Sequence, residues 1–213
     1  SVRPMLATAT TGSAGATLAS ARHVFERKLD GMRVLAHVEP GHPTPDVRLW
    51  SRNGHEKGRQ FPEVVRELQR FVQALGAPVM LDGEVVALDA RGEPTSFVDL
   101  AGRLHERDAR EISRKAAAVP VAFVVFDLLR EAGADLRGLP LADRKARLEK
   151  VFHTRGSERL RAVEYSAGDG RRMLDRAVRE RWEGLVAKDA ASRYDTGRRS
   201  PAWLKIKVLC QQD

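Results

Sequence analysis

A nearly continuous apolar stretch, PVAFVVFDLL at residues 120–129, is the feature that most constrains the fold of this chain. An apolar run of this kind is typical of a buried strand. Stretches that alternate apolar and polar residues predict half-buried strands, and Asp-Gly or Asn-Gly pairs at their ends indicate turns. With 213 residues, of which 42% are apolar, the chain has enough material for one large domain or two small ones. The further strands expected are 23–29, 33–39, 47–52, 79–89, 183–188 and 202–209.

Apolar residues at helical spacing separate these strands. The clearest case is 62–75, which has Pro62 at its start and Gly76 at its end. Strands and helices alternate irregularly, with hairpin-like connections. This order predicts an α/β (α+β) fold with antiparallel-rich sheets flanked by helices, and not a doubly wound fold. The other expected helices are 112–119, 141–152, 168–182 and a short one, capped by Thr95 or Ser96, that ends at Leu104.

Charge and cysteine content narrow the class of protein. The formal net charge is +8, and the whole excess lies in residues 107–213, where 24 lysines and arginines face 16 acids, against 13 and 13 in residues 1–106. This imbalance suggests a polyanionic partner, although solvated helix faces in an arginine-rich proteome explain it equally well. Cys210 is the only cysteine, which excludes a disulfide framework or a cysteine-based zinc site and fits a reducing compartment. No apolar stretch approaches the length of a membrane span, and the opening is too weakly apolar for a signal peptide.

Lys28 lies in the sequence KLDG, at the end of a predicted strand and directly before an Asp-Gly turn. An ordinary lysine has a pKa of about 10.4, so a nucleophilic lysine needs that pKa lowered by partial burial or by neighbouring positive charge. Arg33 and a bound divalent metal are candidate sources of the charge. Asp30 acts in the opposite direction and needs another task, such as fixing a base or orienting the amine. The competing interpretation is a surface lysine before a turn.

Other strands carry side chains that suit a nucleotide. Asp82 and Glu84 lie on one face of a strand, an arrangement that suits a divalent metal or a sugar hydroxyl, and equally a solvent-facing edge. Phe126 is either a core residue or a platform for a flat base. Lys205 and Lys207 share one face of the last strand, where two cations would repel each other and lose hydration. A phosphate between them is the interpretation we favour.

Six short motifs follow one another in a fixed order. They are KLDGMR (28–33), SRNG (51–54), LDGE (81–84), FVVFD (123–127), EGLVAK (183–188) and WLKIK (203–207). Over residues 22–208 this series resembles the motif series of the ATP-dependent DNA ligases, in the covalent nucleotidyltransferase superfamily. PMLAT, FDLL and SRYDTGRRSPAWLK are most similar to bacterial ligases of the end-joining type. The resemblance implies a nucleotidyltransferase (adenylation) domain with a nucleotide pocket between its sheets, acting in DNA repair by non-homologous end joining.

The resemblance also implies a role for each matching residue. Lys28 would attack the α-phosphate of ATP, giving lysyl-AMP and releasing pyrophosphate. AMP would pass to a DNA 5′-phosphate, and a 3′-hydroxyl would displace it to seal the nick. Mg²⁺ or Mn²⁺, together with the cationic last strand, would offset the charge of the triphosphate. The implied positions are Glu26 beside the adenine, Phe126 stacked on it, Glu84 near the ribose and the metal, Glu183 on the metal, Arg33 and Arg52 at the nucleotide or nick phosphate, and Lys188, Lys205 and Lys207 at the phosphates.

The family normally continues into an oligonucleotide-binding (OB-fold) domain that carries one more basic motif. This chain starts at Ser1 and ends in VLCQQD, so we expect a piece of a longer protein. The expected parts are an extended leader (1–21), the adenylation domain (22–208) and the start of a linker to the absent OB-fold domain (209–213). The chain departs from the family pattern at three places. Leu29 and Met32 stand where many relatives have an aromatic residue. Ala101-Gly102 replaces a larger polar pair, and this last departure weakens the case for Arg103 as a site residue.

The expected partner is nicked or broken double-stranded DNA, which Arg198 and Arg199 in the basic loop would help to bind. Other end-joining proteins are further expected partners, and a membrane is not. We expect a monomer in the bacterial cytoplasm, associated with the nucleoid. The alternatives are an RNA ligase or capping-type guanylyltransferase, disfavoured by Arg33 and the WLKIK form, and a non-catalytic DNA-binding module of the same fold. NAD-dependent ligases carry a four-cysteine zinc module that this segment lacks.

Overall fold

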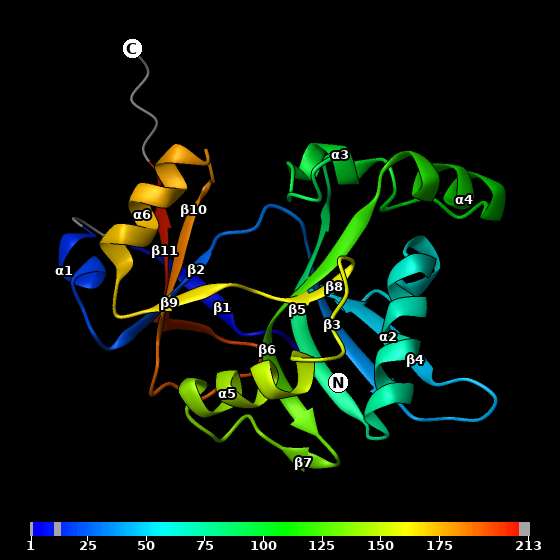
Figure 1. The fold of residues 1–213 in the computed structure, drawn as a ribbon, viewed down its shortest axis with the longest axis horizontal. Helices are drawn as coiled ribbons and strands as arrows, with labels where there is room; N and C mark the ends of the chain where they lie inside the picture. The colour runs from blue at the N-terminus through cyan, green and yellow to red at the C-terminus, as the bar shows by residue number, and fades with distance from the viewer. Residues whose placement is uncertain (1, 11–13, 209–213) are drawn as a thin grey trace. The chain divides into compact units, whose positions relative to one another are not determined.

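The computed structural model describes residues 2–10 and 14–208. The chain divides into two compact units, which we call the first and second unit, and Figure 1 labels their elements. The chain passes from the first unit to the second directly after Leu29, inside the KLDG motif. The first unit comprises residues 1–29, 138–143 and 163–213, and the second comprises 30–137 and 144–162.

The first unit is built on a five-stranded sheet. Its elements are β1 (Leu6–Ala9), α1 (Gly15–Leu18), β2 (His23–Arg27), β9 (Tyr165–Ala167), α6 (Gly170–Arg179), β10 (Gly184–Asp189) and β11 (Arg199–Lys207). The strand order is β1-β11-β10-β2-β9, and all neighbours are antiparallel except β1 and β11. One face of the sheet packs against α6, which Figure 1 shows in orange-yellow. Phe25, Leu185 and Ile206 from the sheet form the core there with Met173 and Ala177 from the helix.

The second unit is built on a six-stranded sheet. Its elements are β3 (Met32–Glu39), β4 (Asp46–Ser51), η1 (Gly58–Gln60), α2 (Pro62–Leu75), β5 (Val79–Ala87), α3 (Phe97–Ala101), α4 (Ala109–Ala118), β6 (Val121–Glu131), β7 (Ala134–Asp135) and β8 (Leu160–Ala162), together with α5 (Leu141–Phe152), which starts in the first unit. The strand order is β4-β3-β5-β6-β7, and β8 pairs parallel with β6. Helix α2 packs against β3, β4 and β6 through the buried Val64, Leu68 and Phe71.

The fold class predicted from the sequence is confirmed, because both sheets are mainly antiparallel and carry helices. The apolar run at 120–129 is β6, which is buried from Val121 to Leu129. Helix α2 has the predicted bounds and ends at Gly76, whose φ of 71° lies in the left-handed region that favours glycine. The helix expected from residue 112 begins earlier, at Ala109, because the Asp108 carboxylate caps it by accepting hydrogen bonds from two backbone N–H groups.

Residues 1–21 were expected to form an extended leader, and the described part of this segment contributes a strand to the first unit. Strand β1 lies beside β11, and the Thr8 hydroxyl donates to the Ser200 carbonyl. Met5 is fully buried, and its backbone N–H donates to the Tyr194 hydroxyl at 3.0 Å. The expected linker, 209–213, lies outside the described residues. Within the described ranges, no helix combines the length and apolar character required to cross a membrane.

Candidate active site

The sequence-predicted site residues are distributed over both units. The first set gathers on β2, β10, β11 and the segments beside them. The second set comes from β3, β5, β6 and the turn after β4. The first set is Glu26, Lys28, Glu183, Lys188, Arg198, Arg199, Lys205 and Lys207, and the second is Arg33, Arg52, Glu84 and Phe126.

Lys28 directly follows β2, and its side chain forms an ion pair with the carboxylate of Glu183. The Lys28 side chain is 18% exposed and that of Glu183 is 39% exposed, so this pair remains open to solvent. The backbone N–H of Lys28 donates to the Gly184 carbonyl at 2.8 Å, which extends the β2–β10 ladder by one residue. The predicted nucleophile and the predicted metal-binding acid therefore contact each other. A carboxylate that holds an ammonium group is also a suitable ligand for a hard cation.

Gly184 lies between Lys28 and Lys207 in the sheet. Its carbonyl accepts from Lys28 on one side, and Lys207 is its register partner on the other. A Cβ at this position would lie only 2.1 Å from the Ile206 carbonyl oxygen. Only a residue without a side chain therefore permits this approach of the strands. The consequence is that Lys207 lies beside Gly184 on the neighbouring strand, two strands away from Lys28.

Glu26 and Lys188 form a second ion pair, which is buried. The Lys188 Nζ lies 2.6 Å from a Glu26 carboxylate oxygen and 4.2 Å from the centre of the Trp203 ring. Both side chains are at most 3% exposed. Glu26 and Lys205 are both register partners of Val186, so these three residues form one row across β2, β10 and β11. The sheet thus presents a polar face opposite the face that packs on α6.

Lys205 and Lys207 are exposed. The sequence-based argument that these two cations lose hydration is therefore wrong. Trp203, which shares their face of β11, fills the buried position and leaves the lysines at the accessible end of the strand. The buried lysine of this region is Lys188, which is compensated by a carboxylate and an aromatic ring. Two exposed cations remain suitable contacts for a phosphate.

In the second unit, the Arg33 side chain contacts two other motif residues, Asp82 and Phe126. Its guanidinium donates to both carboxylate oxygens of Asp82 at 2.6 Å, and its Cζ lies 4.5 Å from the centre of the Phe126 ring. Asp82 is fully buried, so its charge is used to hold Arg33. Glu84 accepts a hydrogen bond from the Gly31 N–H at 2.8 Å and thereby fixes the turn of the KLDG motif. Asp82 and Glu84, for which the sequence left a metal or sugar site and a solvent-facing edge open, thus make two separate contacts within the second unit.

Phe126 occupies an irregular position of β6. Asp82 pairs with Asp127, whereas the next residue, Gly83, pairs with Val125, so Phe126 is an extra residue in the ladder. A bulge of this kind redirects a side chain and is common beside functional sites. The ring is 6% exposed and carries the Arg33 guanidinium described above. Phe126 is therefore a nearly buried aromatic residue with the Arg33 guanidinium over its ring.

The remaining polar residues around the motifs have mainly structural contacts. Asp30 accepts hydrogen bonds from the Phe97 N–H at 3.0 Å and the Ser96 hydroxyl at 3.3 Å, which ties the turn after Lys28 to the start of α3. Arg103 is buried and pairs with Glu63 at 2.6 Å, in agreement with its weakened case as a site residue. Arg52 is exposed in the turn after β4. Within residues 2–10 and 14–208, no group of three or more His, Cys, Asp or Glu side chains is arranged to hold a metal.

The two arginines expected to bind DNA differ in their contacts. Arg198 is exposed, and its backbone carbonyl accepts from the Leu6 N–H at 2.8 Å. The Arg199 guanidinium donates to the Ala7 carbonyl at 2.5 Å and thus helps to hold β1. Sequence reasoning also missed Trp182, which lies directly before Glu183 and has the guanidinium groups of Arg27 and Arg176 each 5.0 Å from its ring. The only signal for it was an aromatic residue next to a motif acid.

Comparisons with known proteins agree with this arrangement. A family model described as the ATP dependent DNA ligase domain matches residues 4–207. The chain is 35% identical over 210 residues to a probable DNA ligase of Streptomyces coelicolor, an alignment that covers 98% of this chain and 39% of the relative. It is 35% identical over 190 residues to the multifunctional non-homologous end joining protein LigD of Pseudomonas aeruginosa, covering 89% of this chain and 20% of that protein.

Solved structures give the same result. The ligase domain of LigD from M. tuberculosis superposes with a TM-score of 0.77 at 32% identity, covering 97% of this chain and 60% of that one. A mycobacterial DNA ligase D complexed with ATP and MES gives a TM-score of 0.74 at 31% identity, with the same coverage. The chain thus spans less than half the length of the two sequence relatives named above. The resemblance found in the motifs is confirmed, and the chain belongs to the family of ATP-dependent DNA ligase domains.

Proposed function

We propose that this chain is an adenylation domain in which Lys28 attacks the α-phosphate of ATP. A P–N bond forms at the amine as the P–O bond to pyrophosphate breaks, which leaves AMP on the lysine. The observation that carries the proposal is the contact of Lys28 with Glu183, next to Gly184 and the cationic end of β11. In the next steps, AMP passes from the lysine to a DNA 5′-phosphate, and a DNA 3′-hydroxyl then displaces the AMP.

The first unit supplies the nucleophile and most of the positive charge. Glu183 is partly exposed, so it fits a divalent cation (Mg²⁺ or Mn²⁺), which proteins often bind through one or two carboxylates plus substrate phosphates. Such an ion would offset the charge of the triphosphate. Lys205 and Lys207 are exposed and suit the phosphate oxygens. Lys188 holds Glu26 in place, and we assign this pair to the end of the nucleotide that carries the base and the α-phosphate.

The second unit supplies contacts for the nucleoside and the nick. We assign Phe126 to the adenine ring, because it is an aromatic residue redirected by a bulge. Glu84 accepts the Gly31 hydrogen bond, and we also assign it a contact with the ribose and a role as a further metal ligand. Arg33 is preorganised by Asp82 for a phosphate, and the exposed Arg52 is assigned to the nucleotide or the nick phosphate.

Sealing a nick completely involves more than this chain, because the relatives that it matches are much longer. We infer that a C-terminal OB-fold domain completes the enzyme and that the chain alone adenylates itself slowly and seals poorly. Two relatives are named as non-homologous end joining proteins, which supports broken double-stranded DNA as the substrate and other end-joining proteins as partners. A monomer acting on DNA in the cytoplasm, near the nucleoid, is the setting that we propose.

A single labelling experiment tests the reaction. The chain is incubated with ATP labelled at the α-phosphate and Mg²⁺, and the protein-bound label is measured after denaturation. We expect label on the wild type and on Lys150→Ala, which removes an exposed lysine of α5, but none on Lys28→Ala. Absence of label on the wild type would favour the non-catalytic DNA-binding module. Labelling by GTP in preference to ATP would favour a capping-type guanylyltransferase.

A further inference from the structure

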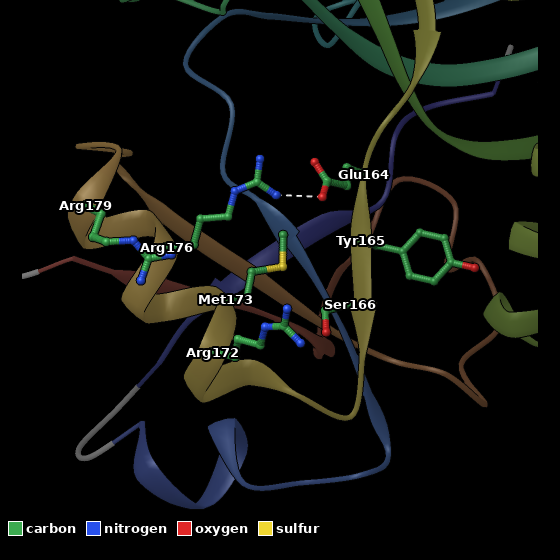
Figure 2. A pocket seen from close by; sticks show the side chains of 7 residues that line it. All are labelled: Glu164, Tyr165, Ser166, Arg172, Met173, Arg176 and Arg179. Carbon is green, nitrogen blue, oxygen red and sulfur yellow. Dashed lines mark hydrogen bonds and ion pairs between the residues drawn. The ribbon is translucent and has the colours of Figure 1, made fainter.

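A basic pocket outside the six motifs lies between α6 and β9 of the first unit. Figure 2 shows its lining, which encloses about 290 Å³. The proposed function assigns no role to any of these residues. The lining residues are Glu164, Tyr165, Ser166, Arg172, Met173, Arg176 and Arg179.

Helix α6 presents its arginines as a line along one face. Arg172, Arg176 and Arg179 are four and three residues apart, so they project from the same side of the helix. At 1.5 Å of rise per residue, the first and last lie about 10 Å apart along the axis. Met173, which is buried between the helix and the sheet, closes the pocket from below. Three arginines and one glutamate give the lining an excess of positive charge.

The central arginine is held in place. Arg176 donates to Glu164 at 2.6 Å and to Glu180 at 2.8 Å, and its Cζ lies 5.0 Å from the centre of the Trp182 ring. These two hydrogen bonds raise the pKa of Arg176, so it stays charged throughout the physiological range. Figure 2 shows its guanidinium directed toward Glu164. Arg176 is therefore a fixed cation and not a mobile surface side chain.

The two outer arginines differ from Arg176. Arg172 and Arg179 are both exposed, and no carboxylate of residues 2–10 or 14–208 forms an ion pair with either side chain. Both residues line the same pocket, and Figure 2 shows the Arg172 side chain near Ser166. A cavity rimmed by cations without carboxylate partners is suited to a ligand that brings its own negative charge.

We propose that this pocket binds the phosphodiester backbone of DNA, with Arg172 and Arg179 each contacting a phosphate. The planar guanidinium fork matches two phosphate oxygens at once. The choice of DNA as the polymer rests on the proposed function. An acidic protein segment fits the pocket less well, because such a segment also needs apolar contacts. Met173 is buried, and Figure 2 shows the Tyr165 ring directed away from the arginines, so neither side chain offers such a contact beside them.

The test compares two double variants of the whole chain. Arg172→Ala with Arg179→Ala removes the rim of the pocket, and Arg66→Ala with Arg171→Ala removes the same charge from exposed positions that do not line it. Binding of a fluorescent nicked duplex is measured over a series of salt concentrations. We expect the pocket variant to lose about 2 from the magnitude of the slope of log K against log salt, at roughly 0.9 per phosphate contact, and the control to retain the wild-type slope. Thermal melting of both variants checks that they fold.

Three results would overturn the pocket assignment. The first is an equal change of slope in both double variants, which would show an effect of overall charge alone. The second is an unchanged slope in the pocket variant. The third is weaker binding of a polyglutamate peptide with DNA binding unaffected, which would identify an acidic protein segment as the ligand. Formation of lysyl-AMP is measured in a separate experiment. If the wild type binds DNA through the pocket but Lys28 is not labelled, the proposed function is contradicted and the assignment of the pocket is retained.

Discussion

At the scale of single residues, Gly184 determines how closely strand β10 approaches strand β11. Its carbonyl holds the backbone of Lys28, and the Ile206 carbonyl occupies the space where a Cβ would lie. Any side chain there has to push β10 and β11 apart. Because Lys28 is attached to the same carbonyl, that shift would move the amine as well. The position of the proposed nucleophile is thus linked to the packing of a neighbouring glycine.

Gly184→Ala is expected to destabilise the chain and to slow labelling of Lys28. The 2.1 Å approach to a backbone oxygen cannot be relieved by a rotamer change, so we expect a loss well above 1 kcal/mol in the free energy of unfolding. The matched control is Gly102→Ala, where the added methyl group meets no atom within 4 Å. Urea unfolding of both variants measures the difference. Equal stability of the two variants would contradict the account of the glycine.

Glu26→Gln is expected to cost about 3–5 kcal/mol, because it leaves the Lys188 charge buried beside a neutral partner. Removing both charges, in Glu26→Gln with Lys188→Met, should recover much of that loss. The control is Arg22→Ala, which breaks an exposed pair with Asp189 and should cost no more than about 1 kcal/mol. Urea unfolding separates the three variants. A small effect of Glu26→Gln alone would mean that solvent reaches this pair.

At this scale the motifs predicted which residues matter better than they predicted what those residues contact. Lys28 and Glu183 were both selected from the sequence, and they meet in the structure. The contacts of Asp30 with the start of α3 and of Asp82 with Arg33 were not among the tasks that the sequence suggested for these acids. Such partners lie far apart in sequence. A spacing rule within one strand contains no information about them.

At the scale of elements, local sequence patterns predicted most helices and strands. The others depend on pairing with residues far away in the sequence. The amphipathic period and the flanking Pro62 and Gly76 were sufficient for α2. Strand β1 was missed because its four residues carry little pattern of their own and become a strand only beside β11, more than 190 residues later. The start of α4 was placed late because the capping group, Asp108, precedes Ile112, the first large apolar residue of the helix, by four positions.

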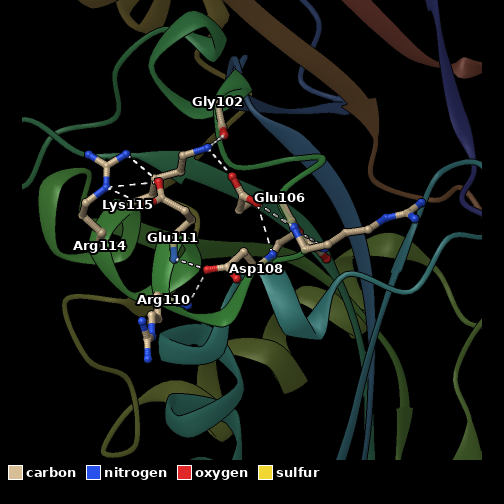
Figure 3. Close-up of polar contacts among 9 residues, drawn as sticks. Gly102, Glu106, Asp108, Arg110, Glu111, Arg114 and Lys115 are labelled. Atoms are coloured by element: carbon tan, nitrogen blue, oxygen red, sulfur yellow. Dashed lines mark hydrogen bonds and ion pairs between the residues drawn. The ribbon is translucent and has the colours of Figure 1, made fainter.

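The segment before α4 allows a test of one polar contact, shown in Figure 3. A hydrogen bond from Lys115 to Glu106, at 2.7 Å, is the main cause that lowers the pKa of Glu106 from 4.5 to about 2. The pKa is lower in the folded state, so the contact stabilises the fold above about pH 4.5 and is lost as the pH falls toward 2. Lys115→Ala should therefore raise the titration midpoint of Glu106 measured by NMR. Arg114→Ala, which removes the partner of Glu111, serves as the control and should shift that midpoint much less.

For the whole molecule, the sequence predicted one adenylation domain over residues 22–208, and the contacts divide the chain into two interleaved units. The reason lies in the boundaries. One crossing falls inside the KLDG motif, directly after Leu29, and another falls inside α5, after Asp143. Sequence reasoning finds domain boundaries as Pro-, Gly- or polar-rich linkers. At these two crossings the chain carries motif residues or a helical pattern instead of such a linker.

The excess of positive charge in the second half of the chain gives the last prediction. Arg198→Glu should weaken DNA binding and reduce the magnitude of the salt slope by about 1, without a change in melting temperature, because its side chain is exposed. Arg199→Glu should weaken DNA binding similarly but also lower the melting temperature, because its guanidinium holds the carbonyl of Ala7 in β1. Comparing the two variants separates the contribution to DNA binding from the contribution to the fold. If Arg198→Glu retains the wild-type slope, Arg198 does not contact DNA, and a weaker binding of Arg199→Glu would then reflect the loss of β1.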